Sequence, residues 1–188
     1  MAKLFLFMMV SVDGFFEGPE HDLSWHNVDA EFNEFAIEQT KAVGALLFGR
    51  RTYELMKSYW PSEQARQGDP AVAELMNTAP KIVFSTSLAG GQETEYWRNV
   101  TLMKELKKSE IEKLKEASQK DLGIFGSNNL CVQLMALGLV DEFRIMVNPV
   151  AIGKGTPLFY GLPGRFKFGL SESRQFASGN LLLRYRPA

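Results

Sequence analysis

The sequence has very little cysteine and histidine, and this scarcity excludes several kinds of site. Cys131 is the only cysteine among 188 residues, so neither an intrachain disulfide nor a cysteine zinc site can form. The two histidines, His21 and His26, stand five residues apart in one segment, which favours a solvated pair over a metal site. No nucleophile has a histidine that the sequence places beside it. We therefore expect no metal and no nucleophilic dyad.

A strong charge imbalance and a long hydrophobic run are also absent. The formal net charge is −1, which gives no electrostatic footprint for nucleic acid or an anionic membrane. The apolar N-terminal run AKLFLFMMV is too short to span a membrane and lacks a signal-peptide cleavage pattern. We expect a cytoplasmic protein whose residues 1–188 form a single domain.

The dinucleotide fingerprint GxGxxG is missing as well, but Asp121–Phe159 shows another pattern with a glycine turn. The apolar runs and glycines of this segment predict a strand at Leu122–Phe125, a turn at Gly126, a helix that ends at Gly138, and a strand at Glu142–Val147. Three residues can cap this helix: Ser127, Asn128 and Asn129. Free amides at such a turn can bind a phosphate, and a plain strand–helix–strand unit fits equally well.

The N-terminal part predicts a buried strand at Lys3–Val10 and then a long loop at 15–29. Asp13 follows the strand in an Asp-Gly turn. It is either a turn residue or a substrate contact, because open α/β sheets bind ligands at strand ends. Trp25 and two phenylalanines suggest that the loop is a lid or pocket wall.

A helix is predicted at Asp29–Lys41, with Asp29 as its cap. Its apolar side carries Phe32, Phe35, Ala36 and Gln39, and its solvated side carries Glu31, Glu34 and Glu38. A third stripe that could border a pocket carries Asn33, Ile37 and Thr40.

Two further strand ends carry residues suited to phosphate. The predicted strand Gly44–Phe48 ends in Gly49-Arg50-Arg51-Thr52 at the start of a helix. Arginine binds phosphate with two hydrogen bonds, so this turn favours a phosphate site over a merely solvated surface. The strand Lys81–Ser85 ends in Ser85-Thr86-Ser87, which are either phosphate contacts or turn caps.

In the rest of the chain the sequence predicts secondary structure but no functional residues. The expected elements are a polar loop at 58–70, a helix at Ala71–Asn77, a short strand at Val100–Met103, a helix at Ser109–Lys120 with a Ser109–Glu112 capping box, and antiparallel strands at Phe166–Glu172 and Leu181–Arg186 after a Gly179-Asn180 turn.

In this order, five segments resemble the dihydrofolate reductase-like superfamily, and especially the bacterial group similar to the C-terminal reductase domain of the riboflavin-pathway enzyme. They are SVDGFFEGP, LLFGRRTYELM, KIVFSTSL, IFGSNNLCVQL and VDEFRIMVNPVAIGKGTPLF. The resemblance covers nearly the whole chain. It implies a three-layer α/β/α fold with a central mixed, mainly parallel sheet, and an NADPH cofactor.

The resemblance also assigns site residues. Asp13 would be the strand-end acid, and Trp25 would be the tryptophan of the active-site loop. With Asn33 and Ile37 of the helix stripe, Trp25 is expected to face the substrate. The cofactor would be held by Val10, Phe48, Gly49, Arg50, Arg51, Thr52, Ser85, Thr86, Ser87, Phe125, Gly126, Ser127, Asn128, Asn129 and Leu130.

One position departs from the family. True dihydrofolate reductases hold the pteridine with a helix carboxylate, and here Phe32 or Asn33 takes that place. No general acid is evident, so water or Asp13 would deliver the proton. We expect an NADPH-dependent reductase acting on a small heterocyclic or carbonyl-type substrate. The alternatives are a riboflavin-pathway pyrimidine reductase or a non-catalytic nucleotide-binding protein, and a homodimer is expected in each case.

Overall fold

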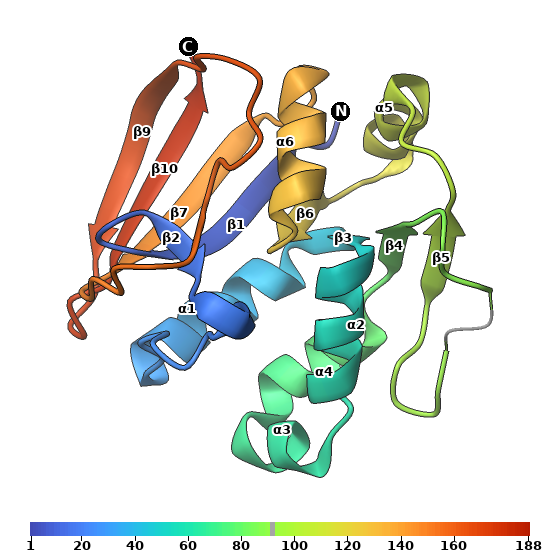
Figure 1. The fold of residues 1–188 in the computed structure, drawn as a ribbon. Helices are drawn as coiled ribbons and strands as arrows, with labels where there is room; N and C mark the ends of the chain where they lie inside the picture. Colours follow the sequence, from blue (N-terminus) through green and yellow to red (C-terminus); the bar gives the residue numbers. More distant parts are fainter. Residues whose placement is uncertain (91–92) are drawn as a thin grey trace.

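The fold is built on one eight-stranded sheet, seen in a computed structural model that describes residues 1–90 and 93–188 (Figure 1). The strand order is β5-β4-β3-β6-β1-β7-β10-β9. The strands are β1 (Leu4–Ser11), β3 (Val43–Gly49), β4 (Lys81–Phe84), β5 (Val100–Met103), β6 (Asp121–Phe125), β7 (Glu142–Asn148), β9 (Phe168–Gln175) and β10 (Leu181–Pro187).

Six of these strands are parallel, and β10 and β9 add to the edge as an antiparallel pair. The carboxyl ends of the six parallel strands therefore meet at one edge of the sheet, where ligands bind in this class of fold. Both chain ends lie at the opposite, amino edge (Figure 1), because β1 begins there and β10 ends there.

Helices cover both faces of the sheet, which confirms the predicted three-layer α/β/α fold with a mixed, mainly parallel sheet. One apolar cluster joins the sheet to α5 (Lys108–Ala117) and α6 (Asn128–Ala136). Clusters on the other face include residues of α1 (Ala30–Lys41), α2 (Arg50–Tyr59) and α4 (Pro70–Thr78). Strand β1 serves both faces, since Leu6 packs in the first cluster and Phe5 in the second.

The predicted loop at 15–29 is more regular than the sequence indicated. Strand β2 (Phe15–Glu17) pairs with β8 (Thr156–Pro157) in a separate two-stranded sheet, and a 3₁₀ turn, η1, covers Pro19–His21. The prediction of one continuous loop missed this pairing because Thr156, the partner of Glu17, lies 139 positions away, beyond the reach of local patterns.

Three local predictions also need correction. The polar loop at 58–70 contains α3 (Glu63–Gly68), which Ser62 caps by accepting a hydrogen bond from Ala65 N at 3.2 Å. The capping box of Ser109 does not form, because α5 begins one residue earlier, after Lys107. Strand β9 spans residues 168–175 in place of 166–172.

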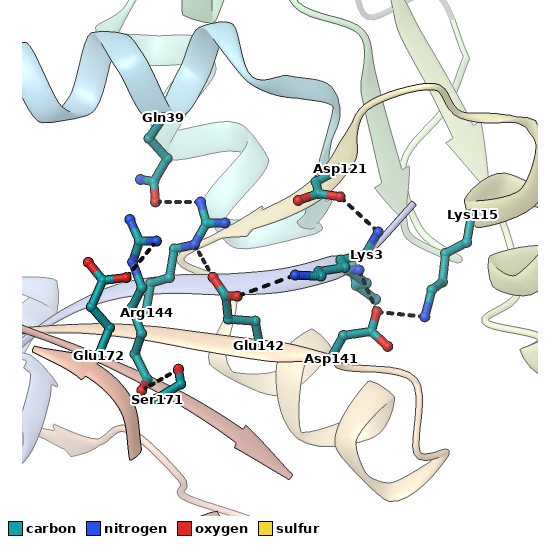
Figure 2. Close-up of polar contacts among 11 residues, drawn as sticks. Lys3, Gln39, Lys115, Asp121, Asp141, Glu142, Arg144, Ser171 and Glu172 are labelled. Atoms are coloured by element: carbon teal, nitrogen blue, oxygen red, sulfur yellow. Dashed lines mark hydrogen bonds and ion pairs between the residues drawn. The ribbon is translucent and has the colours of Figure 1, made fainter. Parts of the chain in front are cut away.

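A polar network ties the amino edge of the sheet together (Figure 2). Lys115 Nζ lies 2.6 Å from an oxygen of Asp141. The buried Glu142 pairs with Arg144 at 2.6 Å, and Arg144 also donates to Gln39 Oε1 of α1 at 3.2 Å. The Lys115–Asp141 ion pair holds α5, and the Arg144–Gln39 hydrogen bond holds α1, against the edge opposite the carboxyl ends. Among the described residues, no helix is long and apolar enough to cross a membrane.

Candidate functional site

Two glycine turns meet at the carboxyl edge, at the ends of the neighbouring strands β3 and β6. Gly49 N donates to Ser127 Oγ at 2.9 Å, a contact between residues 78 positions apart. Gly49 starts α2 and Ser127 starts α6. In the described part of the chain, neither helix start has a side-chain cap, whereas α1 is capped by Asp29 as predicted, at 2.8 Å. Both starts therefore keep amide donors for a ligand.

The second turn is left-handed at two successive residues. Gly126 has φ +72° and Ser127 has φ +62°, and Ser127 O accepts the first bond of α6 from Cys131 N at 2.9 Å. A Cβ at Gly126 would lie 3.0 Å from Thr52 Cγ2. The turn after β6 thus packs directly on the first turn of α2, and the two predicted phosphate turns form one surface.

The two arginines of the GRRT turn do not act as a pair. Arg50 Nη1 lies 3.4 Å from Glu54 one turn along α2, with both side chains about half exposed. Arg51 Nη2 lies 3.2 Å from Nδ1 of His21 in the 15–29 segment. The guanidinium of Arg50 therefore lies on the surface of α2, whereas that of Arg51 contacts the 15–29 segment.

The hydroxyls that follow β4 form a turn. Ser85 Oγ accepts hydrogen bonds from Ser87 N at 3.2 Å and Leu88 N at 3.1 Å. Thr86 and Ser87 are exposed. Because Gly49 pairs with Phe84 in the sheet register, Arg50 and Ser85 directly follow two neighbouring strands. Ser85 Oγ therefore caps the turn as an acceptor, and its own O–H, like the hydroxyl of the exposed Thr86, remains a donor for a phosphate.

The other predicted cofactor residues are either core residues or residues whose side chains form hydrogen bonds within the protein. The side chains that pack in the core are Val10, Phe48, Phe125 and Leu130, so only their backbone could meet a ligand. Asn128 Nδ2 donates to Leu158 O and ties α6 to the segment after β8. Asn129 is exposed and contacts Gln133 of its own helix.

Asp13 fastens the loop that follows β7. Its carboxylate accepts hydrogen bonds from Gly153 N at 2.8 Å and Ile152 N at 3.2 Å. A hydrogen bond from the Ser11 side chain, and then those from the two amides, hold the pKa of Asp13 below its usual value. An ionised carboxylate engaged in this way is a poor proton donor at neutral pH.

An asparagine network that the sequence did not suggest holds the Trp25 segment. Asn27 N donates to Asn148 Oδ1 at 2.8 Å, and Asn27 O accepts from Asn180 Nδ2 at 2.7 Å. Asn148 and Asn180 are both fully buried. Trp25 Nε1 donates to Asp22 O at 3.1 Å, so the tryptophan ring is fixed beside the carboxyl edge. Single asparagines carry no sequence signal of a contact over 120 positions.

His26 is not solvated, which corrects the prediction for this histidine. Its ring packs edge-on against Trp25 with centroids 4.5 Å apart. Its Nε2 is buried and has no hydrogen-bond partner among the described residues. Burial lowers the pKa of His26 to about 4, so the ring is neutral at physiological pH.

Helix α1 presents no carboxylate at the place expected in a dihydrofolate reductase. Phe32 is buried in the core, and Asn33 and Ile37 are half-buried. Glu31 lies at the surface, and its oxygens accept hydrogen bonds from Arg174 at 3.0 Å and from Ala177 N at 2.8 Å. Glu34 is exposed.

The fold and the joined glycine turns define a dihydrofolate reductase-like α/β protein. More narrowly, the chain belongs to the RibD C-terminal domain family, which it matches over residues 2–182. It is 28% identical to the uncharacterized protein YyaP of Bacillus subtilis over 185 residues, covering 97% of this chain and 94% of YyaP. It is 25% identical to YwjB of the same organism, covering 93% and 92%.

Solved structures show the same fold. A putative riboflavin biosynthesis protein from Shewanella aligns with a TM-score of 0.74 at 23% identity, over 100% of this chain and 99% of that one. A deaminase/5-amino-6-(5-phosphoribosylamino)uracil reductase from Thermotoga maritima aligns with a TM-score of 0.69 at 15% identity. The chain spans 57% of the length of that longer protein.

The donor set at the carboxyl edge fits a phosphorylated dinucleotide. It combines amide groups at two uncapped helix starts, two guanidinium groups and the hydroxyls of Thr52 and Thr86. Donors of these kinds bind phosphate oxygens. No group of three or more potential metal ligands occurs within residues 1–90 and 93–188.

Proposed function

We propose that this protein is an NADPH-dependent reductase that transfers a hydride to a small heterocyclic or carbonyl-type substrate. The observation that carries the proposal is the Gly49 N–Ser127 Oγ bond, which joins two uncapped helix starts beside Arg50 and Arg51. Membership of the RibD C-terminal domain family supports a reductase. When bound, NADPH would supply the hydride.

The chain itself would bind and orient the dinucleotide. The amides at the start of α2 and in the Gly126-Ser127 turn would donate to phosphate oxygens. Arg50, Ser85 and Thr86 would meet the 2′-phosphate, since they follow neighbouring strands. Core side chains beneath the turns, such as Phe48 and Phe125, would keep the backbone in place.

On the substrate side, Trp25, Asn33 and Ile37 would form the wall of the pocket and exclude water from the reacting atoms. Asp13 is ionised and engaged by two backbone amides. We therefore assign delivery of the proton to water in place of Asp13.

A riboflavin-pathway pyrimidine reductase is the second candidate, supported by the activity named for the Thermotoga protein. The substrates of such an enzyme carry a phosphoribosyl group. The residues we place on the substrate side carry no positive charge to bind that phosphate, which favours the more general reductase. A nucleotide-binding protein without catalysis is the third candidate.

Calorimetric titration with NADPH and NADH tests the cofactor assignment. A charge-assisted hydrogen bond contributes about 1.5–3 kcal/mol, so we expect at least tenfold tighter binding of NADPH. Arg50→Ala should remove this preference, while the control Glu54→Gln, which alters only the partner of Arg50, should keep it. Equal affinities of the parent for both nucleotides would contradict the proposal.

A substrate panel then separates the three candidates. NADPH oxidation with unphosphorylated heterocycles or carbonyl compounds supports the general reductase. Oxidation only with the phosphoribosylated pyrimidine supports the riboflavin-pathway reductase. Tight NADPH binding without oxidation on any substrate supports the non-catalytic protein.

We further propose a cytoplasmic homodimer. The edge strand β9 has seven exposed residues out of eight, including Leu170, and Leu181 of β10 is exposed beside it. The outer edge of such a strand leaves backbone donors and acceptors that are suited to pairing with a second copy. Sedimentation of the parent should give twice the chain mass of 21.2 kDa, and a single-chain mass would contradict the proposal.

A further inference from the structure

The turn that joins the lower ends of β9 and β10 in Figure 1 is bonded to the start of α1 and to the residues before it. Asn180 Nδ2 donates to Asn27 O at 2.7 Å, and Asn27 Nδ2 donates to Ser178 O at 2.9 Å. Glu31 accepts from Ala177 N at 2.8 Å. These three bonds join residues 146 to 153 positions apart, so the folded sheet alone brings the two segments together.

The turn itself is a fixed support. Phe176 N donates to Asn180 O at 2.9 Å, and Gly179 N donates to Phe176 O at 3.0 Å. A Cβ at Gly179 would lie 3.3 Å from Cγ of Pro149, which follows β7. Phe176 is buried, with its ring 5.8 Å from that of Phe35 in α1. The turn therefore packs on both the end of β7 and helix α1.

Asn27 is attached on its other side to the sheet. Its backbone N donates to Asn148 Oδ1 at 2.8 Å. Asn148 is fully buried at the end of β7, and its Nδ2 donates to Met146 O at 3.1 Å and Val10 O at 3.3 Å. Both backbone polar groups of Asn27 are thus bonded to the amides of buried asparagines, one in the sheet and one in the turn.

Hydrogen bonds, more than packing, hold the segment that carries Trp25. No side chain from residue 19 to residue 31 is fully buried. Trp25 bonds to Asp22 O and packs against the His26 ring, both within the same segment. In the described part of the chain, the hydrogen bonds of Asn27 are the nearest to Trp25 that reach other elements. A segment held in this way loosens locally when one bond is lost.

We propose that Asn180 is a positioning residue of the substrate side, which holds Trp25 in place through Asn27. The turn between β9 and β10 is then a part of the substrate site, although no residue of it touches substrate. Trp25 forms a preformed wall, because its segment is bonded to two rigid supports. This inference rests on the proposed reductase function, in which Trp25 borders the substrate.

Fluorine NMR of protein labelled with 5-fluorotryptophan tests the attachment without any substrate. The chain has three tryptophans, and the variant Trp25→Phe assigns the line of Trp25. Asn180→Ala removes the donor to Asn27 O and should shift or broaden the Trp25 line, with the Trp97 line unchanged. An unchanged Trp25 line would overturn the inference.

Asn77→Ala is the matched control. Asn77 is also buried, and its Nδ2 donates to a backbone oxygen, Trp60 O, at 3.0 Å. This variant should therefore lose a comparable bond but move the Trp60 line and keep the Trp25 line. A Trp25 line that moves equally in both variants would show a general loosening of the protein and would overturn the inference.

Steady-state kinetics test the role in substrate binding, with the panel compound that the parent reduces at the lowest KM. Asn180→Ala should raise KM by about tenfold, the upper range for one hydrogen bond, and keep kcat and the Kd of NADPH within about twofold. Asn77→Ala should keep all three values. A fall in kcat at constant KM would contradict the assignment, because a misplaced wall weakens binding of the substrate.

The inference and the proposed function fail separately. If the parent reduces a compound and Asn180→Ala keeps its KM, the positioning role is wrong and the reductase proposal stands. If the parent reduces no compound, the reductase proposal fails, and the Trp25 line alone decides whether Asn180 holds the ring. Should Asn180→Ala not fold, Asn27→Ala replaces it, since this variant removes only the bond to Ser178 O. An unchanged Trp25 line in that variant would then overturn the inference.

Discussion

At the residue scale, Gly126 is required by the fold before any ligand is considered. Its φ of +72° is left-handed, and a Cβ there would lie 3.0 Å from Thr52 Cγ2. A valine at this position would strain the protein itself, so it cannot separate folding from cofactor binding. Alanine is the better probe, because its single methyl group isolates the contact with Thr52.

We predict that Gly126→Ala lowers the free energy of unfolding by about 1–3 kcal/mol, from the left-handed backbone and from crowding against Thr52. Gly138→Ala is the matched control, because Gly138 has φ +68° and open space around its Cβ position. Denaturant unfolding should show a smaller loss for Gly138→Ala. Equal losses of unfolding free energy in the two variants would show that the Thr52 side chain moves aside without cost.

His26 makes the stability of the protein sensitive to acid. Its pKa falls from 6.5 to about 4 on folding, because burial disfavours the charged ring. As the pH drops through 6.5, His26 becomes protonated in the unfolded chain but stays neutral in the folded protein. The contribution of the neutral ring is therefore complete above pH 6.5 and is lost progressively between pH 6.5 and 4.

We predict that the parent loses on the order of 2–3 kcal/mol of stability through His26 across this range. His26→Gln, which cannot be protonated, should lose less over the same range. The measurement is the free energy of unfolding by denaturant at a series of pH values from 7 to 4. Parallel curves for parent and variant would show that His26 is solvated in solution.

At the scale of elements, helix α1 separates this protein from dihydrofolate reductases. Pteridine recognition in those enzymes needs a carboxylate, and an unpaired buried polar edge costs about 1–3 kcal/mol per group. Glu31 is held by Arg174 and Ala177, and Glu34 is exposed. The helix could supply only Asn33, which lacks the negative charge that favours a protonated pteridine.

We therefore predict turnover with dihydrofolate and NADPH orders of magnitude below about 10 s⁻¹, the median for enzymes. A steady-state assay measures it, with a parallel NADPH titration to show that the cofactor site is intact. Turnover near the median would mean that a carboxylate of α1 reaches the pocket after all.

The predictable elements are those with strong local signals. The β1, β3 and β6 strands are apolar runs followed by turn residues, and α1 has both an aspartate cap and a periodic apolar face. Helix α3 has six residues and only Ala65 buried, so it leaves no periodic pattern. Strand β2 depends on a distant partner in β8.

The same distinction applies to the candidate site. The glycine turns at Gly49 and Gly126 could be found from the sequence, because glycine at a strand end is a local signal. The contact of His21 with Arg51 and the network of Asn27, Asn148 and Asn180 could not. They are single side chains brought together only when the sheet orders its strands.

At the scale of the whole molecule, the two edges of the sheet have different roles. The carboxyl edge collects exposed donors around the glycine turns. The amino edge holds ion pairs that are largely buried, with Arg144 against the Phe5 ring at 3.6 Å and bonded to Glu142 and Gln39. A substitution at the amino edge should therefore change stability without changing ligand binding.

We predict that Arg144→Met lowers the free energy of unfolding by about 3 kcal/mol, because it leaves the buried carboxylate of Glu142 without its main partner. Lys3 Nζ, at 4.0 Å and half exposed, is too distant and solvated to replace the guanidinium. The double variant Glu142→Gln/Arg144→Met removes the stranded charge and should recover most of the loss. Denaturant unfolding measures both variants, and NADPH titration of the folded single variant should match the parent. A loss below about 1 kcal/mol would show that Glu142 reaches solvent when Arg144 is removed, and weakened NADPH binding would show that the two edges of the sheet are coupled.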